Sequence, residues 1–229
     1  MKDLIFAIMV ALVPPGVSIQ STVIAKRTDP PICSDSTKMI CRKPWFSKRR
    51  KAWVLPEKKA DAVLRYSQIA EIIDSVSTKH PKWPGSKTDL VHHLLTVARH
   101  ESSFTRDVHD GSHRGDCDWS GYCKSSCLGQ ILVGRGRSRF TKYKHRDLVG
   151  LDKSSTSRCI ETMAAYLSAS KAFCLKRRKG DRCTFGVYGG VRSPSTDKRI
   201  RAREQTLFRV RALHNEKIGK TRPKAGPKR

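Results

Sequence analysis

Residues 90–101 read LVHHLLTVARHE, an apolar run of helical length that ends in a carboxylate. Three apolar residues lie seven, four and three positions before Glu101: Leu94, Val97 and Ala98. In an α-helix these spacings place the side chains on one face, which predicts a buried helix with Glu101 at its end. Burial disfavours the ionised carboxylate and raises its pKa, which is what a general acid working near neutral pH requires.

The neighbours of Glu101 offer two other interpretations. A glutamate at a helix end is often the partner of a nearby cation, here Arg99 or Arg106, in an ion pair that serves only the fold. The His100-Glu101 pair suggests a zinc protease, but that motif needs a second histidine where Phe104 stands. A general acid and a structural ion pair therefore remain as the alternatives.

Three further segments follow this helix in order along the chain. The helix end is ARHESSF (98–104), and the three segments after it are SCLGQI (126–131), AAYL (164–167) and FGVYGG (185–190). They resemble the catalytic helix end, the Gly-Leu-Met-Gln-Ile turn, the helix behind the site and the Ala-Tyr-Asn-x-Gly segment of soluble lytic transglycosylases and goose-type lysozymes. Cys127 and Gly129 replace the usual Gly and Met, and Gly189 stands where Asn is usual. The resemblance spans roughly residues 60–195.

The resemblance implies a mainly α, lysozyme-like (α+β) fold, with a helical catalytic domain and a small irregular or hairpin lobe over residues 105–126. It implies cleavage of the MurNAc-GlcNAc β-1,4 bond of peptidoglycan glycan strands, with Glu101 as acid and base and with no cofactor or metal. A lytic transglycosylase closes a 1,6-anhydro ring with the sugar's own hydroxyl, whereas a goose-type lysozyme uses water. The residues carried over as substrate-binding are Ser102, Gln130, Ile131, Tyr166 and Tyr188.

Several of these assignments have structural alternatives. Tyr188 could hydrogen-bond Glu101 and keep it protonated, but Tyr166 and Tyr188 are also ordinary core aromatics with satisfied hydroxyl groups. A glycosidase usually needs a second carboxylate, although the transglycosylase route does not. The candidates for that carboxylate, each of which is also a common turn residue, are Asp107, Asp110, Asp116 and Asp118.

The charge of the chain is strongly positive. Its 229 residues include 47 Lys and Arg against 20 Asp and Glu, a net charge of +27, and 19 of the basic residues lie between Lys171 and Arg229. Such a surface attracts polyanions, so we expect anionic wall polymers as partners and activity that falls with ionic strength. The rivals are a non-catalytic binder of nucleic acid or other polyanions, and a cationic secreted protein that keeps the fold without turnover.

The N-terminus predicts an export signal over residues 1–25. Lys2 gives a positive start, residues 4–13 are apolar but too few to span a bilayer, residues 14–16 break the run, and residues 23–25 are small enough for cleavage. An uncleaved apolar segment is the alternative. We therefore exclude this segment from the fold and expect a periplasmic or extracellular monomer without a membrane span.

Eight cysteines agree with export, because disulfide bonds persist in oxidising compartments. Proximity along the chain predicts the pairs Cys33–Cys41, Cys117–Cys123, Cys174–Cys183 and Cys127–Cys159. The alternative is a zinc site built from Cys117, Cys123 and Cys127 with His109 or His113, but these spacings match no common zinc pattern.

The remaining sequence divides into a basic extension (26–55), a lysozyme-like domain (56–214) and a disordered basic tail (215–229). Helices are expected from Pro56 to before Pro81, from Ser86 or Thr88 to Glu101, from a cap at 154–157 to Phe173, over 184–187, and from Thr196 or Asp197. Inward positions are expected at Val63, Tyr66, Ala70, Ile73 and Val76, and later at Ile200, Leu207, Phe208 and Val210.

Overall fold

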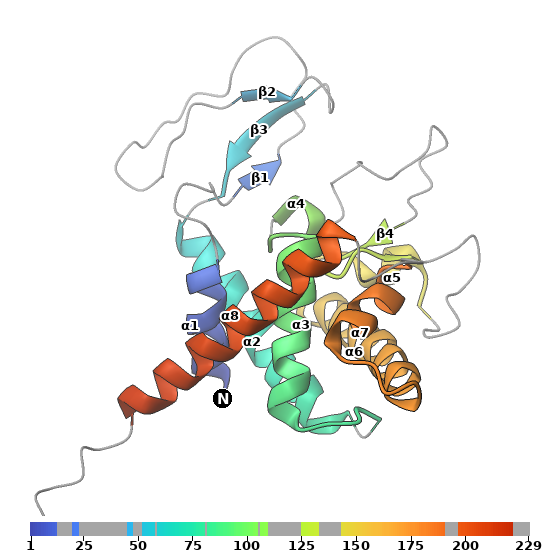
Figure 1. Cartoon of the computed structure of the whole chain (residues 1–229). Coiled ribbons are helices and arrows are strands. Elements are labelled where there is room, and N and C mark those ends of the chain that lie inside the picture. Colours follow the sequence, from blue (N-terminus) through green and yellow to red (C-terminus); the bar gives the residue numbers. More distant parts are fainter. Residues whose placement is uncertain are drawn as a thin grey trace, which may run out of the picture.

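The computed structural model is mainly helical (Figure 1). It describes residues 1–12, 20–22, 45–47, 52–57, 59–80, 82–104, 106–109, 125–132, 143–190 and 197–221. Within these residues the helices are α1 (Lys2–Leu12), α2 (Lys59–Lys79), α3 (Lys87–Glu101), α4 (Arg106–His109), α5 (His145–Leu148), α6 (Lys153–Lys176), α7 (Asp181–Tyr188) and α8 (Lys198–Thr221). The strands are β1 (Gln20–Thr22), β2 (Trp45–Ser47), β3 (Ala52–Pro56), β4 (Ser125–Ser126) and β5 (Ile131–Leu132).

Helix α3 lies at the centre of the helical body. Every residue from Leu90 to Ala98 is buried, as the apolar run predicts, and α3 contacts α1, α2, α6 and α8. The Ser86 hydroxyl accepts a hydrogen bond from the Asp89 backbone N–H at 3.1 Å, which fixes the start of the helix. Figure 1 shows α8 lying across α1 and α3, so the last long helix covers the end of α3 that carries Glu101.

Several helix boundaries differ from their predicted positions. Helix α2 begins at Lys59, because Pro56 ends strand β3. Helix α6 is capped by the Asp152 carboxylate, which accepts from the Ser155 N–H at 2.8 Å, and not by residues 154–157. Asp197 accepts from the Arg199 N–H at 2.7 Å and so opens α8 as predicted.

The inward faces are mostly as predicted, with two errors. Val63 is 42% exposed and Phe208 is 61% exposed, so neither contributes to the core. Arg203 is instead buried on the inner face of α8, between Ile200 and Leu207. Helix α8 also continues through residues 215–221, which were expected to be disordered.

In the full chain the N-terminal residues pack on the helical body, although the sequence predicts that they are removed as a leader. Ile5, Ile8 and Met9 on α1 are almost completely buried in the same core as α2 and α3. The Arg99 side chain donates through Nε to the Leu12 carbonyl at 2.9 Å and ties the end of α1 to α3. Export and cleavage of the leader stay predictions.

Strands from the predicted leader and from the basic extension form a sheet that the sequence does not indicate. Strand β3 lies between β1 and β2 in an antiparallel order β1-β3-β2, with Gln20 opposite Pro56 and Trp45 opposite Val54. A second pair, β4 and β5, forms a small hairpin with Ser126 opposite Ile131. This hairpin holds the turn at residues 126–131, and most of the lobe expected over residues 105–126 lies outside the described residues.

Two of the predicted disulfide pairs are confirmed. Cys127–Cys159 joins the β4–β5 turn to α6, and Cys174–Cys183 joins the end of α6 to α7. The pairs Cys33–Cys41 and Cys117–Cys123 lie outside the described residues. Disulfide bonds are compatible with an exported protein. Within the described part of the chain, no helix is both long and apolar enough to span a membrane.

Candidate active site

Glu101 ends α3 directly after the buried apolar face, where the spacing predicts it. Its side chain is 18% exposed, and its Oε1 pairs with Nη2 of Arg203 from α8. The predicted partner Arg99 instead donates to the Leu12 carbonyl and to the Ser103 hydroxyl. Glu101 therefore does form an ion pair, but its partner is Arg203, which lies 102 positions later in the chain.

This pair acts against the predicted protonation of Glu101. Burial alone favours the neutral carboxylic acid, whereas a guanidinium in contact favours the carboxylate. In the free protein, therefore, the carboxylate is the form that the Arg203 contact stabilises.

Ser102 serves the end of the helix. Its hydroxyl donates to the Ala98 carbonyl at 2.7 Å and accepts from the Phe104 N–H at 3.2 Å, and the residue is only 6% exposed. These bonds turn the chain sharply after Glu101. A direct role for Ser102 in binding substrate is not supported by this arrangement.

The backbone is strained on both sides of the site. Ser103 and Phe104 have φ angles of 51° and 55°, and Cys127 and Gln130 have φ angles of 55° and 46°. Non-glycine residues rarely adopt these left-handed conformations, and those that do are concentrated at functional sites. Of the five such residues in the described chain, these four flank Glu101 or lie in the β4–β5 turn.

Tyr188 connects Glu101 to that turn. Its hydroxyl donates to the Gly129 carbonyl at 2.9 Å, one residue before Gln130. Burial raises the pKa of Tyr188 well above its usual value, and the nearby charge of Glu101 raises it further. Tyr188 is therefore a neutral hydroxyl that touches the turn and lies in the field of Glu101, although it donates to Gly129 rather than to Glu101 as predicted.

Gly129 is required by the close approach of two side chains. A Cβ at this position would lie 2.5 Å from Cγ of Met163 and 2.7 Å from the hydroxyl of Tyr188. Met163, on α6, thus occupies the space where a longer side chain at position 129 would begin. The departure from the usual Met is therefore accommodated by local packing.

The other predicted residues divide between site and core. The ring of Tyr166 lies edge-on to that of Tyr188, with centroids 6.0 Å apart, so Tyr166 packs behind the site. Ile131 is 3% exposed and belongs to the core. Gln130 is half-buried at the turn. The side chains of all four candidate second carboxylates lie outside the described part of the chain.

Arg203 is the site residue that the sequence analysis missed. It is 8% exposed, and its Nη1 lies 3.0 Å from where a Cβ would stand at Gly189. The available signal was its position on the α8 stripe, three residues after Ile200 and four before Leu207. An arginine on an apolar helical stripe requires a buried partner, and Glu101 supplies it.

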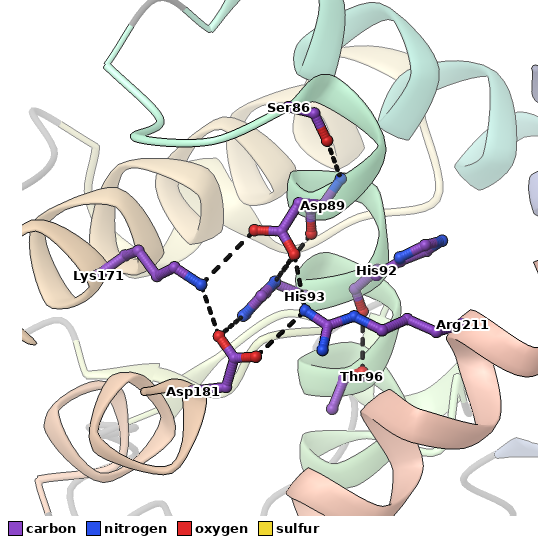
Figure 2. A network of polar contacts seen from close by, with 8 residues as sticks. All are labelled: Ser86, Asp89, His92, His93, Thr96, Lys171, Asp181 and Arg211. Atoms are coloured by element: carbon purple, nitrogen blue, oxygen red, sulfur yellow. Dashed lines mark hydrogen bonds and ion pairs between the residues drawn. The ribbon is translucent and has the colours of Figure 1, made fainter. Parts of the chain in front are cut away.

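A second polar cluster joins four helices (Figure 2). Asp89 on α3 and Asp181 on α7 each pair with Lys171 of α6 and Arg211 of α8. His93 lies between them, with Nδ1 2.8 Å from the Asp89 carbonyl and Nε2 3.0 Å from the Asp181 carboxylate. Both ring nitrogens of His93 therefore face hydrogen-bond acceptors.

This polar cluster links helices α3, α6, α7 and α8 and is separate from the candidate active site. Asp89 precedes Glu101 by 12 positions, or about 18 Å along the helix axis at 1.5 Å per residue. Its two carboxylates are matched by cations from neighbouring helices, so their charge is already neutralised. The pKa of Asp181 lies below its usual value because hydrogen bonds and charges from His93 and Lys171 outweigh burial, which raises it.

The described residues contain no group of three or more His, Cys, Asp or Glu arranged to hold a metal ion. Cys127 is bonded to Cys159, which removes it from the alternative zinc set. His109 is buried with its Nε2 2.8 Å from the Thr156 hydroxyl, and burial lowers its pKa to about 3.

Comparison with known proteins gives no relative: no family model, no curated protein and no solved structure matches this chain.

Proposed function

We propose that this chain cleaves the MurNAc-GlcNAc β-1,4 bond of peptidoglycan, with Glu101 as the general acid and then the general base, on a lysozyme-like fold. The observation that carries the proposal is the position of Tyr188. It hydrogen-bonds the turn that holds Gln130, and its pKa, raised mainly by burial, responds also to the charge of Glu101. Segments whose order in the sequence resembles one enzyme family are thereby neighbours in space.

The chemistry needs one proton donor and an environment that fixes it. Protonating the glycosidic oxygen makes it a better leaving group, and a positioned carboxylic acid contributes about 10²–10⁴-fold to such a step. Glu101 is fixed by the end of a buried helix and by the strained turn at Ser103 and Phe104. The transglycosylase route then returns the proton to Glu101 from the C6 hydroxyl of the sugar and needs no second carboxylate.

The basic surface supports the choice of substrate and compartment. A net charge of +27 favours binding to the anionic polymers of a bacterial wall. Two disulfide bonds fit a periplasmic or extracellular location.

Mass spectrometry of the soluble fragments released from purified wall tests the proposal. Wild-type protein should release disaccharide peptides with 1,6-anhydro ends, and reducing ends would indicate the hydrolytic lysozyme alternative. Glu101→Gln should release neither. Equal release by wild type and Glu101→Gln would contradict the proposal.

A second candidate is a cationic secreted protein that keeps this fold without turnover. The Arg203–Glu101 pair favours it, because a purely structural carboxylate would make the same contact. Wall binding by the wild-type protein without any released fragment would identify this candidate.

A further inference from the structure

From the contacts of Glu101 we infer that Arg203 is a positioning residue for it. Arg203 holds the carboxylate in the free protein, and the two side chains separate before Glu101 carries the proton of the reaction. This inference rests on the proposed function. Their side chains are only 10% and 18% exposed, so water screens the pair weakly.

Among the described residues, helices α7 and α8 and helix α3 itself bring charged or titratable groups near Glu101. Arg203 and Arg199 come from α8, and the charge of Arg199 interacts with that of Glu101. Tyr188 comes from α7 and has a pKa raised mainly by burial. His100, on α3 itself, has a pKa lowered mainly by burial and then by Arg203. At neutral pH the tyrosine and the histidine are therefore uncharged, and both arginines favour the Glu101 anion.

The guanidinium of Arg203 is incompletely bonded. Its Nε is buried and has no hydrogen-bond partner among the described residues. A buried donor without an acceptor costs free energy, which would be recovered if a bound glycan offered a hydroxyl or N-acetyl oxygen. The contact of Nη2 with Glu101 thus holds the guanidinium in the free protein, while the unbonded Nε favours movement of the guanidinium toward a bound glycan.

Gly189 provides the space that the guanidinium needs. Its φ and ψ of −84° and 5° are accessible to any residue, so the backbone does not require glycine there. A Cβ at this position would lie 3.0 Å from Nη1 of Arg203 and 3.3 Å from the Phe185 carbonyl oxygen. The absence of a side chain at position 189 therefore admits the arginine to the site.

Water supplies the proton that Glu101 needs once Arg203 has moved away. As the guanidinium moves away, Glu101 takes up one proton from solvent. Glu101 then gives that proton to the glycosidic oxygen while the bond between this oxygen and the anomeric carbon breaks. The alkaline limb of kcat/KM reports the essential acid of the free enzyme, so it should depend on the Arg203 contact.

The test compares Arg203→Met, which removes the charge, with Arg203→Lys, which keeps it. The carboxyl ¹³C signal of Glu101, assigned by its loss in Glu101→Gln, should titrate about 1–2 pH units higher in Arg203→Met than in wild type. The alkaline limb of kcat/KM should move upward by a similar amount. Arg203→Lys should stay close to wild type, as should Arg209→Met, which removes an exposed arginine of the same helix.

A second variant tests the same contact without altering the arginine. Gly189→Asn should displace the guanidinium and raise the pH at which Glu101 titrates in an otherwise wild-type protein. The same substitution should cause no further shift of that pH in Arg203→Met. Unchanged titration of Glu101 in folded Arg203→Met and Gly189→Asn would overturn the inference. The titration needs no turnover, so it stands apart from the proposed function, whose failure would appear as the absence of released fragments at every pH.

Discussion

At the scale of single residues, the inferred charge state of Glu101 depends on its contact with Arg203, and that contact depends on the glycine at position 189. Gly189 leaves room for Arg203, and Arg203 reaches Glu101. The helical spacing of residues 90–101 correctly predicts where Glu101 lies. It could not predict the partner, because ion pairing across 102 positions depends on how α8 packs on α3.

Tyr188 gives a direct prediction at this scale. Replacing it with Phe removes the hydroxyl that donates to Gly129, so the free energy of unfolding should fall by about 1 kcal/mol. The turn that holds Gln130 should loosen, and the rate of wall lysis should fall by about tenfold or more, because small displacements weaken catalysis strongly. Chemical denaturation and a turbidity assay measure the two effects. Unchanged stability together with unchanged lysis would show that this hydroxyl does not organise the site.

At the scale of elements, helix α1 is the clearest difference from the sequence-based expectation. An apolar run of ten residues after a lysine is typical of an export signal, and the same composition suits a core helix. Only the contacts of Ile5, Ile8 and Met9 with the rest of the core distinguish the two in the full chain. The sequence also does not predict the three-stranded sheet. Its strands are only three to five residues long and pair through backbone groups, so they leave no clear side-chain pattern.

Two substitutions in α1 test its place in the fold. Ile8 is 1% exposed, so Ile8→Ala in the full-length chain should lower the free energy of unfolding by about 2–4 kcal/mol. Val10 is 49% exposed, so Val10→Ala should change it by less than about 0.5 kcal/mol. Urea denaturation of both variants gives the comparison. Near-zero effects for both would place α1 outside the cooperative fold.

Packing between α3 and α8 predicts a pH dependence of stability. Burial, followed by the charges of His214 and Arg211, lowers the pKa of His92 from 6.5 to about 4. The unfolded chain binds a proton in this window that the folded chain does not, so stability is full above pH 6.5 and falls as the pH drops toward 4. The loss attributable to His92 should be at most about 3 kcal/mol.

His92→Phe isolates this contribution. The variant should lose less stability than wild type between pH 6.5 and pH 4.5, because Phe takes up no proton on unfolding. Denaturation curves at intervals of half a pH unit measure the difference. Parallel curves for the two proteins would assign the acid sensitivity to other groups, among them His109 and His214, whose pKa values burial also lowers from 6.5.

At the scale of the whole molecule, the positive charge predicts how the protein meets its substrate. Screening shortens the reach of surface charge to about 10 Å at 0.1 M salt and about 3 Å at 1 M. Lysis of intact wall should therefore fall steeply between 0.05 M and 0.5 M NaCl, while cleavage of a short uncharged glycan should change little. Binding to wall that persists undiminished in strong salt would contradict this electrostatic account.

The central claim is that Glu101 donates the proton that breaks the glycan. Initial rates of fragment release should be compared for wild type, Glu101→Gln and the matched control Glu71→Gln, which alters a surface glutamate paired with Lys153. The account predicts a loss of about 10³-fold in Glu101→Gln and an unchanged rate in Glu71→Gln. A Glu101→Gln protein that is folded and releases fragments as fast as wild type would contradict it.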